Sequence, residues 1–298
     1  MFRKFLSCLL IPSIIACSFL SADSFRDREE EDNPFGRHFF WDNEFYYYQD
    51  ADFTDIADSI RYYEGRSELR YQFGIDPEHA IYIGGGYELI GLKWLANPHF
   101  SDDRFERFIA TVGLVSVCFT DWVWKSRISL YSDLDEAFRH RYNLYEGMAW
   151  GTYDWNHRTN VHIGLLARIG MHQEDIYPIL GFDYRPTQCW EFSVIFPMDT
   201  SIMYHPNEDW SMGVAIRYAK TRARVGALET VPNAIFEYMN YGGELRLNFH
   251  PHPAFKLSLV GGSTISGEIE VFDATGNTID KQDIDPSIYF GGSLDLIY

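Results

Sequence analysis

Charged side chains recur at alternating positions along this sequence, in register with apolar residues. In a strand, such charges project from one face while the apolar residues cover the other. The set comprises Arg70, Lys125, Arg127, Arg168, Asp183, Arg185, Arg217, Glu244, Arg246 and Lys256. Around water, charges of both signs would create a transverse field that screens solutes. Paired with one another, they would instead fill the interior as salt bridges, and the sequence leaves both interpretations open.

Two other groups of residues have side chains that can bind metal ions. His250 and His252 are separated by one proline, and Asp273 and Asn277 lie in an acidic stretch that continues to Asp285. Neither group has the spacing of a dedicated zinc or calcium site. We therefore interpret the first as a turn and the second as a solvated acidic loop over Gly267 to Pro286, and we expect no metal and no cofactor.

The elements that carry the charges are predicted to be strands, and the last twelve residues show this best. Ile288, Phe290, Leu294, Leu296 and Tyr298 fall on one face at period two, and small or polar residues fall on the other. The same alternation recurs from Ser67 onward. A helix would scatter these residues over every face. The sequence therefore predicts an all-β fold with one apolar face and one polar face.

The amino terminus predicts export. Arg3 and Lys4 precede an apolar run, Phe5 to Leu20, that is too short for a spanning helix, and small residues follow it. We predict a signal peptide over residues 1–22. Cys17 lies in a loose match to a lipoprotein cleavage box, so lipidation is an alternative. Residues 23–65 form an acidic leader with a candidate first strand near Phe39 to Tyr48, and residues 66–298 form the main domain.

Composition restricts the class of protein further. The formal net charge is -18, which excludes a nucleic-acid partner because no basic surface is available for phosphates. Mean hydropathy is -0.24, which excludes a bundle of membrane-spanning helices. Aromatic residues make up 17% of the chain. These values suit a transmembrane barrel, in which only alternate residues meet lipid and aromatic residues gather at the membrane interfaces.

The lengths of the connections between the predicted strands alternate. Short turns follow Ile75, Phe119, Tyr153, Arg185, Tyr204 and Phe249, and longer loops follow Leu92, Ser132, Arg224 and Gly267. Bacterial outer-membrane barrels have short periplasmic turns and long external loops. The pattern predicts an antiparallel up-and-down β-barrel of about 12–14 strands, counted from segments of spanning length.

On these features, the mature chain resembles a Gram-negative outer-membrane β-barrel protein. Leu294, Leu296 and Tyr298 match the carboxy-terminal assembly signal of that class. More narrowly, the stretch Tyr177 to Pro186, followed by Trp190, Phe192 and Trp210, is similar to a repeated strand-turn-strand pattern in outer-membrane proteins of unassigned function. The resemblance implies location in the bacterial outer membrane, contact with its lipid and lipopolysaccharide, and insertion by the barrel-assembly machinery.

The resemblance also provides one test for an enzyme. Outer-membrane phospholipases and lipid A deacylases resemble one another in a His-x-Ser pair, with His as base and Ser as nucleophile. Here His157 and Thr159 come closest, with Thr in place of Ser and at a turn. We therefore predict that the protein is not an enzyme. The expected function is a narrow porin-like channel for small solutes. The alternative is a closed barrel with an adhesive or structural role through acidic external loops.

Overall fold

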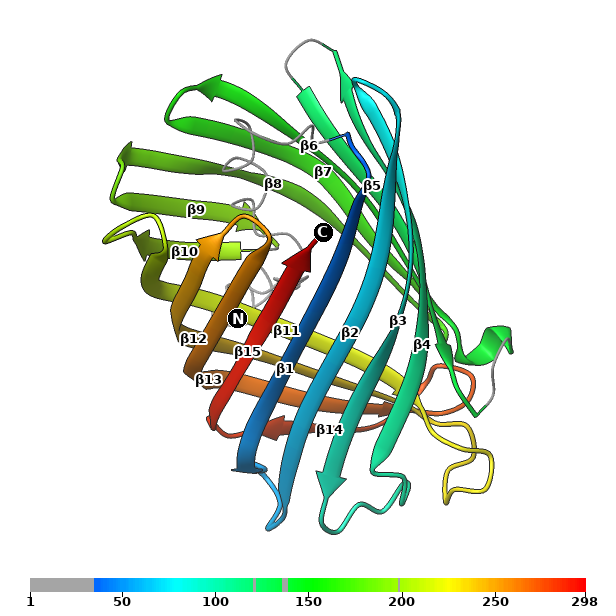
Figure 1. The fold of residues 1–298 in the computed structure, drawn as a ribbon. Coiled ribbons are helices and arrows are strands. Elements are labelled where there is room, and N and C mark those ends of the chain that lie inside the picture. The colour runs from blue at the N-terminus through cyan, green and yellow to red at the C-terminus, as the bar shows by residue number, and fades with distance from the viewer. Residues whose placement is uncertain (1–34, 120–121, 136–138, 198) are drawn as a thin grey trace, which may run out of the picture.

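The computed structural model describes residues 35–119, 122–135, 139–197 and 199–298. Its strands form one antiparallel sheet (Figure 1). They are β1 (His38–Asp52), β2 (Ser59–Asp76), β3 (His79–Trp94), β4 (Arg104–Cys118), β5 (Trp122–Asp133), β6 (Leu144–Asn156), β7 (Thr159–Gly170), β8 (Gln173–Thr187), β9 (Trp190–Phe196), β10 (Asp199–Tyr204), β11 (Trp210–Arg224), β12 (Ile235–His252), β13 (Phe255–Phe272), β14 (Thr278–Ile284) and β15 (Ile288–Ile297), with a short 3-10 helix, η1 (His140–Tyr142). Among the described residues, no helix has the length and apolar character needed to cross a membrane.

The sheet closes into a barrel because β15 pairs with β1 on one side and with β13 on the other. Strands β1 to β13 each pair with the next in antiparallel order. Strand β14 pairs with the outer part of β13 and runs in the same direction as β15. Together, β14 and β15 form one wall strand interrupted at residues 285–287. The fifteen strands therefore make a barrel of 14 wall strands, which confirms the predicted fold and the upper end of the predicted range.

The predicted alternation of apolar and polar faces is confirmed. Outward-facing residues such as Leu69, Ile83 and Leu180 are more than half exposed and form an apolar outer surface. Large aromatic residues on neighbouring strands contact one another at the end that carries the short turns, for example Trp122 with Tyr153 and Trp190 with Tyr204. Such a girdle is typical of the membrane interface of an outer-membrane barrel.

Both chain ends of the barrel lie at the end with the short turns. The backbone of Phe39 donates to Tyr298 O at 2.7 Å, and Tyr298 N donates back at 2.9 Å. The barrel wall begins at His38, within the segment predicted as a candidate first strand, and β2 begins at Ser59, before the predicted domain boundary at residue 66. The predicted signal peptide, with Cys17, lies outside the described residues.

The prediction of a long loop over Gly267 to Pro286 is wrong. Strand β13 continues to Phe272 and pairs with β14, so only residues 273–277 connect them. The carboxylate of Asp273 accepts hydrogen bonds from the backbone N–H groups of Thr275 and Asn277, which closes a tight turn. Lys281 pairs with Glu268 at 2.7 Å across this hairpin. The acidic residues therefore lie in a polar extension of the wall, where cross-strand pairing makes a charged hairpin compatible with strand structure.

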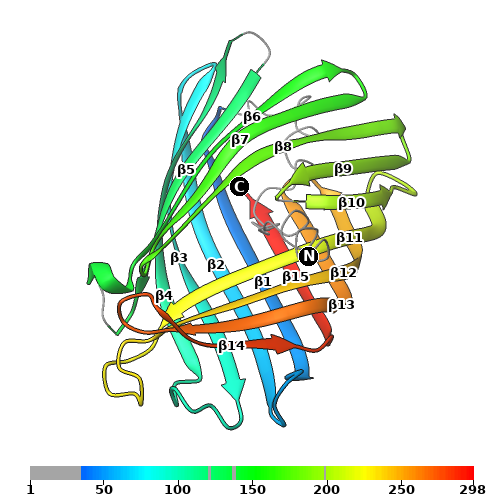
Figure 2. The same cartoon turned by 180° about the vertical axis from the view of Figure 1, so that it is seen from behind.

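The outer parts of β11 and β12 are buried on both faces, which distinguishes them from the rest of the wall. One face, with Ala223, Phe236 and Tyr238, packs against residues of β1 to β4. The other face, with Tyr218 and Tyr241, packs against residues of β6 to β9. Strands β11 to β13 cross over β1 to β4 at a steep angle in both views (Figures 1 and 2). We call residues 217–224 and 235–242 the inserted hairpin, because they occupy the barrel interior.

Tyr218 corrects one prediction. The period-two pattern of β11 assigned it to the apolar outer face, together with Ile216. Ile216 is 45% exposed, but Tyr218 is 1% exposed and belongs to an interior cluster. The change occurs because β11 passes inside the neighbouring strands beyond this level, so its outward face meets protein in place of lipid.

Candidate functional site

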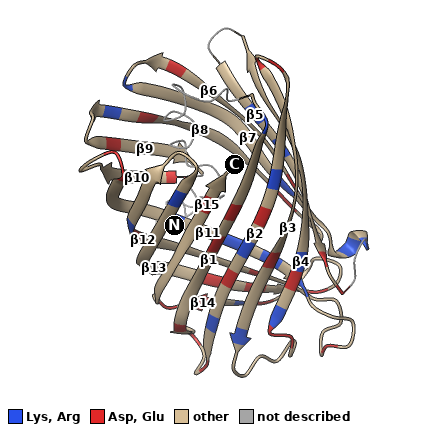
Figure 3. Ribbon diagram, viewed as in Figure 1, with Lys and Arg blue, Asp and Glu red and all other residues tan. Residues whose placement is uncertain are grey.

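Charged residues of both signs are distributed along the strands of the barrel (Figure 3). The ten charged residues singled out in the sequence lie on the inward faces of their strands. Most are in short ion pairs: Arg70 with Asp42, Arg127 and Arg168 with Glu146, Arg185 with Glu191, Arg217 with Glu64, and Arg246 with Glu244 and Asp199. The structure therefore places these residues inside, and their role in selecting solutes stays a prediction.

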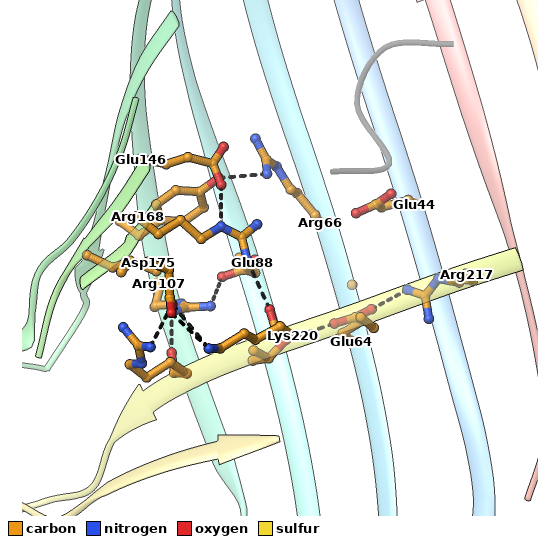
Figure 4. Close-up of a pocket in the computed structure, with 16 residues that line it drawn as sticks. Glu44, Glu64, Arg66, Glu88, Arg107, Glu146, Arg168, Asp175, Arg217 and Lys220 are labelled. Carbon is orange, nitrogen blue, oxygen red and sulfur yellow. Dashed lines mark hydrogen bonds and ion pairs between the residues drawn. The ribbon is translucent and has the colours of Figure 1, made fainter. Parts of the chain in front are cut away.

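A charged cavity of about 60 Å³ lies between the inserted hairpin and the wall (Figure 4). Its charged lining consists of Glu44, Glu64, Arg66, Glu88, Arg107, Glu146, Arg168, Asp175, Arg217, Lys220 and Arg222. These residues come from β1 to β4, from β6 to β8 and from β11. Of the ten predicted site residues, Arg168 and Arg217 line this cavity, and the other eight lie elsewhere in the barrel.

Two arginines converge on one carboxylate at one side of the cavity. Glu146 accepts from Arg127 Nη2 at 2.6 Å and from Arg168 Nε at 2.7 Å. Its side chain is 1% exposed. A buried carboxylate is costly unless it is paired and hydrogen-bonded. Each oxygen of the Glu146 carboxylate accepts a hydrogen bond from one of the two arginines. This ion-paired group therefore stabilises the packing of the interior.

A second ionic group lies where the inserted hairpin approaches β8. Lys220 Nζ lies 3.2 Å from Asp175 and 2.9 Å from Glu237, and Arg222 Nη2 lies 2.9 Å from Asp175. Arg222 also pairs with Glu237 by Nε at 2.8 Å. Arg107 of β4 pairs with Glu88. Charges from three separate parts of the wall therefore meet around the hairpin.

A third pair crosses the interior directly. Arg217 Nη2 donates to Glu64 Oε1 at 2.6 Å, from β11 to β2. The guanidinium carbon of Arg217 lies 3.7 Å from the centre of the Tyr46 ring, within the range of a cation–π interaction. Arg217 and Glu64 both line the cavity, so opposite charges lie side by side there.

Aromatic side chains narrow the interior on the outer side of the cavity. The rings of Tyr62 and Tyr238 are stacked with centroids 4.2 Å apart, and Tyr48 lies 5.0 Å from Tyr289 in the same way. Tyr62 Oη donates to Thr221 at 2.8 Å. We call these four tyrosines the tyrosine layer. It joins the inserted hairpin to the wall, and we infer that it is the constriction of the barrel on that side.

Two external loops meet beyond the tyrosine layer. The backbone and hydroxyl of Ser101 donate to Glu229 at 2.6 and 2.9 Å, and Gly226 N donates to Asp102 at 3.0 Å. Burial and the adjacent Glu229 carboxyl raise the pKa of Asp102, whereas the Ser101 N–H lowers the pKa of Glu229. The loop of residues 95–103 is thereby fixed to the loop of residues 225–234, at the end of the inserted hairpin.

Sequence reasoning missed most of the cavity lining, for two different reasons. Glu64 and Arg66 share the parity of Arg70, and extending β2 towards its amino terminus would have found them. Lys220 and Arg222 have the opposite parity to Arg217, so a period-two pattern assigns them to the outside. Only the burial of the inserted hairpin on both faces brings them inside.

Two of the described histidines, His157 and His162, lie in different surroundings. His157 lies in an exposed turn next to Thr159. The buried His162 accepts from Trp150 Nε1 at Nδ1, 3.1 Å, and its Nε2 lies 2.8 Å from Asp183. Both ring nitrogens therefore have partners. Among the described residues, His, Cys, Asp and Glu side chains form no group of three that could hold a metal ion.

Comparison with known proteins agrees with the fold. No protein-family model matches the chain. An uncharacterised protein of Chlamydia trachomatis is 24% identical over 290 residues, covering 91% of this chain and 90% of that protein. An uncharacterised protein of Chlamydia muridarum is 23% identical over 289 residues, with the same coverage. Among solved structures, the COG4313 outer membrane channel of Pseudomonas putida F1 is similar with a TM-score of 0.51 and 8% identity, covering 91% of this chain and 98% of that one.

The chain therefore has the fold of a bacterial outer-membrane β-barrel. An apolar outer surface, an aromatic girdle and a closed sheet are the features that a barrel needs to reside in lipid, because every backbone polar group of the wall must be paired there. The fold and the surface together place the protein in the bacterial outer membrane.

Proposed function

We propose that the protein is a narrow porin-like channel for small solutes, and that its charged cavity selects them. The observation that carries the proposal is the Arg217–Glu64 pair, which spans the interior beside the cavity. Rings of charged side chains across a water-filled path are a common means of selectivity in channels. The similarity to the COG4313 outer membrane channel supports the same function.

The cavity favours small and charged solutes over large and neutral ones. Its volume of about 60 Å³ has room for only a few water molecules, and the tyrosine layer is closely packed, so passage of a solute requires this layer to move. Six basic and five acidic side chains line it, so it offers partners to charges of either sign. The protein is therefore proposed to conduct in small steps and to discriminate by charge.

The experiment is a planar-bilayer recording of the purified full-length protein. Discrete and reproducible current steps support the channel. Insertion without current, shown by protease protection of the same sample, contradicts it. Exchange of Arg217 for Glu tests selectivity, because it reverses one charge of the spanning pair. Folding of this variant is checked by the heat-dependent shift of the barrel on gels.

A second function is favoured by one observation. The tyrosine layer and Phe100 fill the outer end of the barrel. Phe100 is 3% exposed, and its ring packs against Phe105 and Phe236. A barrel sealed in this way could serve as a structural or adhesive surface through its acidic external loops. That function predicts that the natural protein passes no current in the bilayer. It also predicts that replacement of residues 273–277 abolishes binding to a partner.

We also propose that Leu294, Leu296 and Tyr298 are read by the barrel-assembly machinery, and that the outer surface contacts membrane lipid and lipopolysaccharide. Support comes from the position of Tyr298, which pairs with Phe39 where the first and last strands meet. This closing pair forms only when the barrel is complete.

A further inference from the structure

The barrel wall is not hydrogen-bonded along its full height. Pairing between β8 and β9 ends at Leu180 with Phe196, and pairing between β10 and β11 ends at Thr200 with Ile216. Beyond that level, in the described part of the chain, residues 173–179 of β8 pair only with β7, and residues 217–224 of β11 pair only with β12. Both strands continue past the β9–β10 hairpin (Figure 2). We call the boundary between these two segments the seam.

Side chains close the seam. Asp175 of β8 holds Lys220 and Arg222 of β11 by ion pairs. The carbonyl oxygens of Lys220 and Arg222 accept from Arg168 Nη1 at 3.2 Å and from Arg107 Nη1 at 2.7 Å. A strand edge in a membrane needs such partners, because unpaired backbone groups are costly there. Side-chain contacts can separate without breaking the sheet, which a hydrogen-bonded ladder cannot do.

The seam lies between the charged cavity and an apolar outer surface. Asp175 and Lys220 line the cavity. On the outside, Ile176 and Leu180 of β8 and Ile216 of β11 are 61%, 53% and 45% exposed. Between β8 and β11, the side chains of Tyr177, Ile179 and Tyr218 form one buried apolar cluster. Only this cluster of side chains therefore separates the charged cavity from the apolar outer surface.

We propose that the seam is a lateral route between the cavity and the membrane, and that its solute is an amphipathic carboxylate with a short alkyl chain. This inference rests on the proposed channel function and extends it. The head group takes the place of Asp175 against Lys220 and Arg222, where an anion finds two basic partners. The six basic and five acidic groups of the cavity favour an anionic head over a cationic one. The alkyl chain lies in the Tyr177–Ile179–Tyr218 cluster and extends into lipid.

The test uses a diazirine derivative of decanoate as a photoreactive probe, with the full-length protein in proteoliposomes. We expect the probe to label the peptides that contain Tyr177, Ile179 and Tyr218. Decanoate should compete with this labelling, whereas decanol, which lacks the carboxylate, should not. Labelling confined to outward residues such as Leu69 and Ile83 would overturn the proposal, since that pattern is ordinary contact with lipid.

A cross-linking variant tests the route. In a background with all four cysteines (Cys8, Cys17, Cys118 and Cys189) replaced by Ser, the pair Asp175→Cys and Lys220→Cys is joined across the seam by a cleavable bismaleimide. This pair leaves Arg222 as the basic partner of the head group. We expect loss of seam labelling when the linker is present and recovery when it is cleaved. The matched control joins Ala167→Cys to Ile176→Cys, which are register partners on β7 and β8, and it should leave the labelling unchanged. Labelling that persists with the seam joined would contradict the route.

Conductance of the same samples separates this inference from the channel function. Current steps together with a seam that is never labelled would refute the lateral route and leave the channel in place. Absence of current from inserted protein would refute the channel, and with it the passage of solute through the seam, whatever the labelling shows.

Discussion

Arg217 of β11 and Glu64 of β2 form an ion pair of 2.6 Å across the interior of the barrel. Their positions are 153 residues apart in the sequence, and their strands lie on facing sides of the cavity. Arg217 is 4% exposed and its guanidinium also lies over the ring of Tyr46. The pair therefore fixes the inserted hairpin to the wall and places opposite charges beside the path proposed for solutes.

Replacement of Arg217 by Gln should shift ion selectivity towards cations. The substitution leaves the carboxylate of Glu64 without its basic partner beside the cavity. The reversal potential in a KCl gradient measures the shift. Arg61→Gln is the control, because Arg61 pairs with the exposed Asp50 on the outer part of β1 and β2 and does not line the cavity. Equal reversal potentials for Arg217→Gln and the natural protein would contradict a role in selectivity.

The same pair should contribute strongly to the stability of the fold. Removing one partner of a buried ion pair typically costs about 3–5 kcal/mol, because the other charge is left uncompensated. Arg217→Gln and Glu64→Gln should each lower the urea concentration at which the barrel unfolds. The double variant should lose less than the sum of the two single losses. Additive losses would show that the two side chains do not interact in the membrane.

Removal of the Tyr238 ring should widen the constriction. Tyr238 stacks on Tyr62 and is 3% exposed, so Tyr238→Ala opens the tyrosine layer beside the cavity. Single-channel conductance should rise relative to the natural protein. Tyr238→Phe keeps the ring and should leave conductance unchanged. Large-to-small changes of buried aromatic residues cost about 3–5 kcal/mol, so folding is checked by the heat-dependent shift of the barrel on gels.

The contact between the external loops should weaken as pH rises. Burial and Glu229 raise the pKa of Asp102, so the folded loops bind its proton more tightly than the unfolded chain does. The stabilisation is fully present below the ordinary carboxyl pKa of about 3.9 and is lost as pH rises through the raised value. Hydrogen exchange at the Val231 amide, which donates to His99 O at 2.8 Å between the two loops, measures it after correction for the intrinsic rate.

Asp102→Asn provides the comparison for that measurement. The Asn side chain does not titrate, so the variant should protect the Val231 amide equally from pH 4 to pH 8, a range that starts near the ordinary Asp pKa of about 3.9. A natural protein whose protection also stays constant over this range would show that Asp102 does not titrate within the loop contact.

Deletion of Tyr298 should slow assembly without preventing strand formation. Its backbone makes two hydrogen bonds with Phe39 at the closing pair of strands, at 2.7 and 2.9 Å. We expect a lower yield of heat-modifiable barrel in the outer membrane. Deletion of residues 273–277 with a two-glycine replacement is the control, since that turn lies at the opposite end of the barrel. Normal yield after deletion of Tyr298 would argue against an assembly signal.

Much of the barrel could be predicted from the sequence because alternation along a strand has a single physical cause. A wall strand between lipid and a polar interior must show apolar residues at period two, as the terminal strand does. The same rule predicted that Arg168 and Arg217 face inward. It failed at residues 267–286, where the apolar residues Ile269, Val271 and Ile284 face the core and the charged residues face outward, so the pattern of a lipid-facing strand is absent.

The cavity could not be predicted in the same way. Lys220 and Arg222 line it although their parity on β11 differs from that of Arg217. Their position depends on the inserted hairpin, in which Glu237 is the register partner of Arg222, and on contacts with Asp175 of the distant strand β8. A period-two pattern identifies a strand that has lipid on one face and the polar interior on the other. It contains no information on a segment that meets protein on both faces.

The single-channel current of the natural protein in a planar bilayer tests the central claim most directly. We predict small and discrete steps whose reversal potential changes when Arg217 is replaced by Glu. Inserted protein that passes no current, both as the natural chain and as Tyr238→Ala, would contradict the channel and would favour a closed barrel that acts through its external loops.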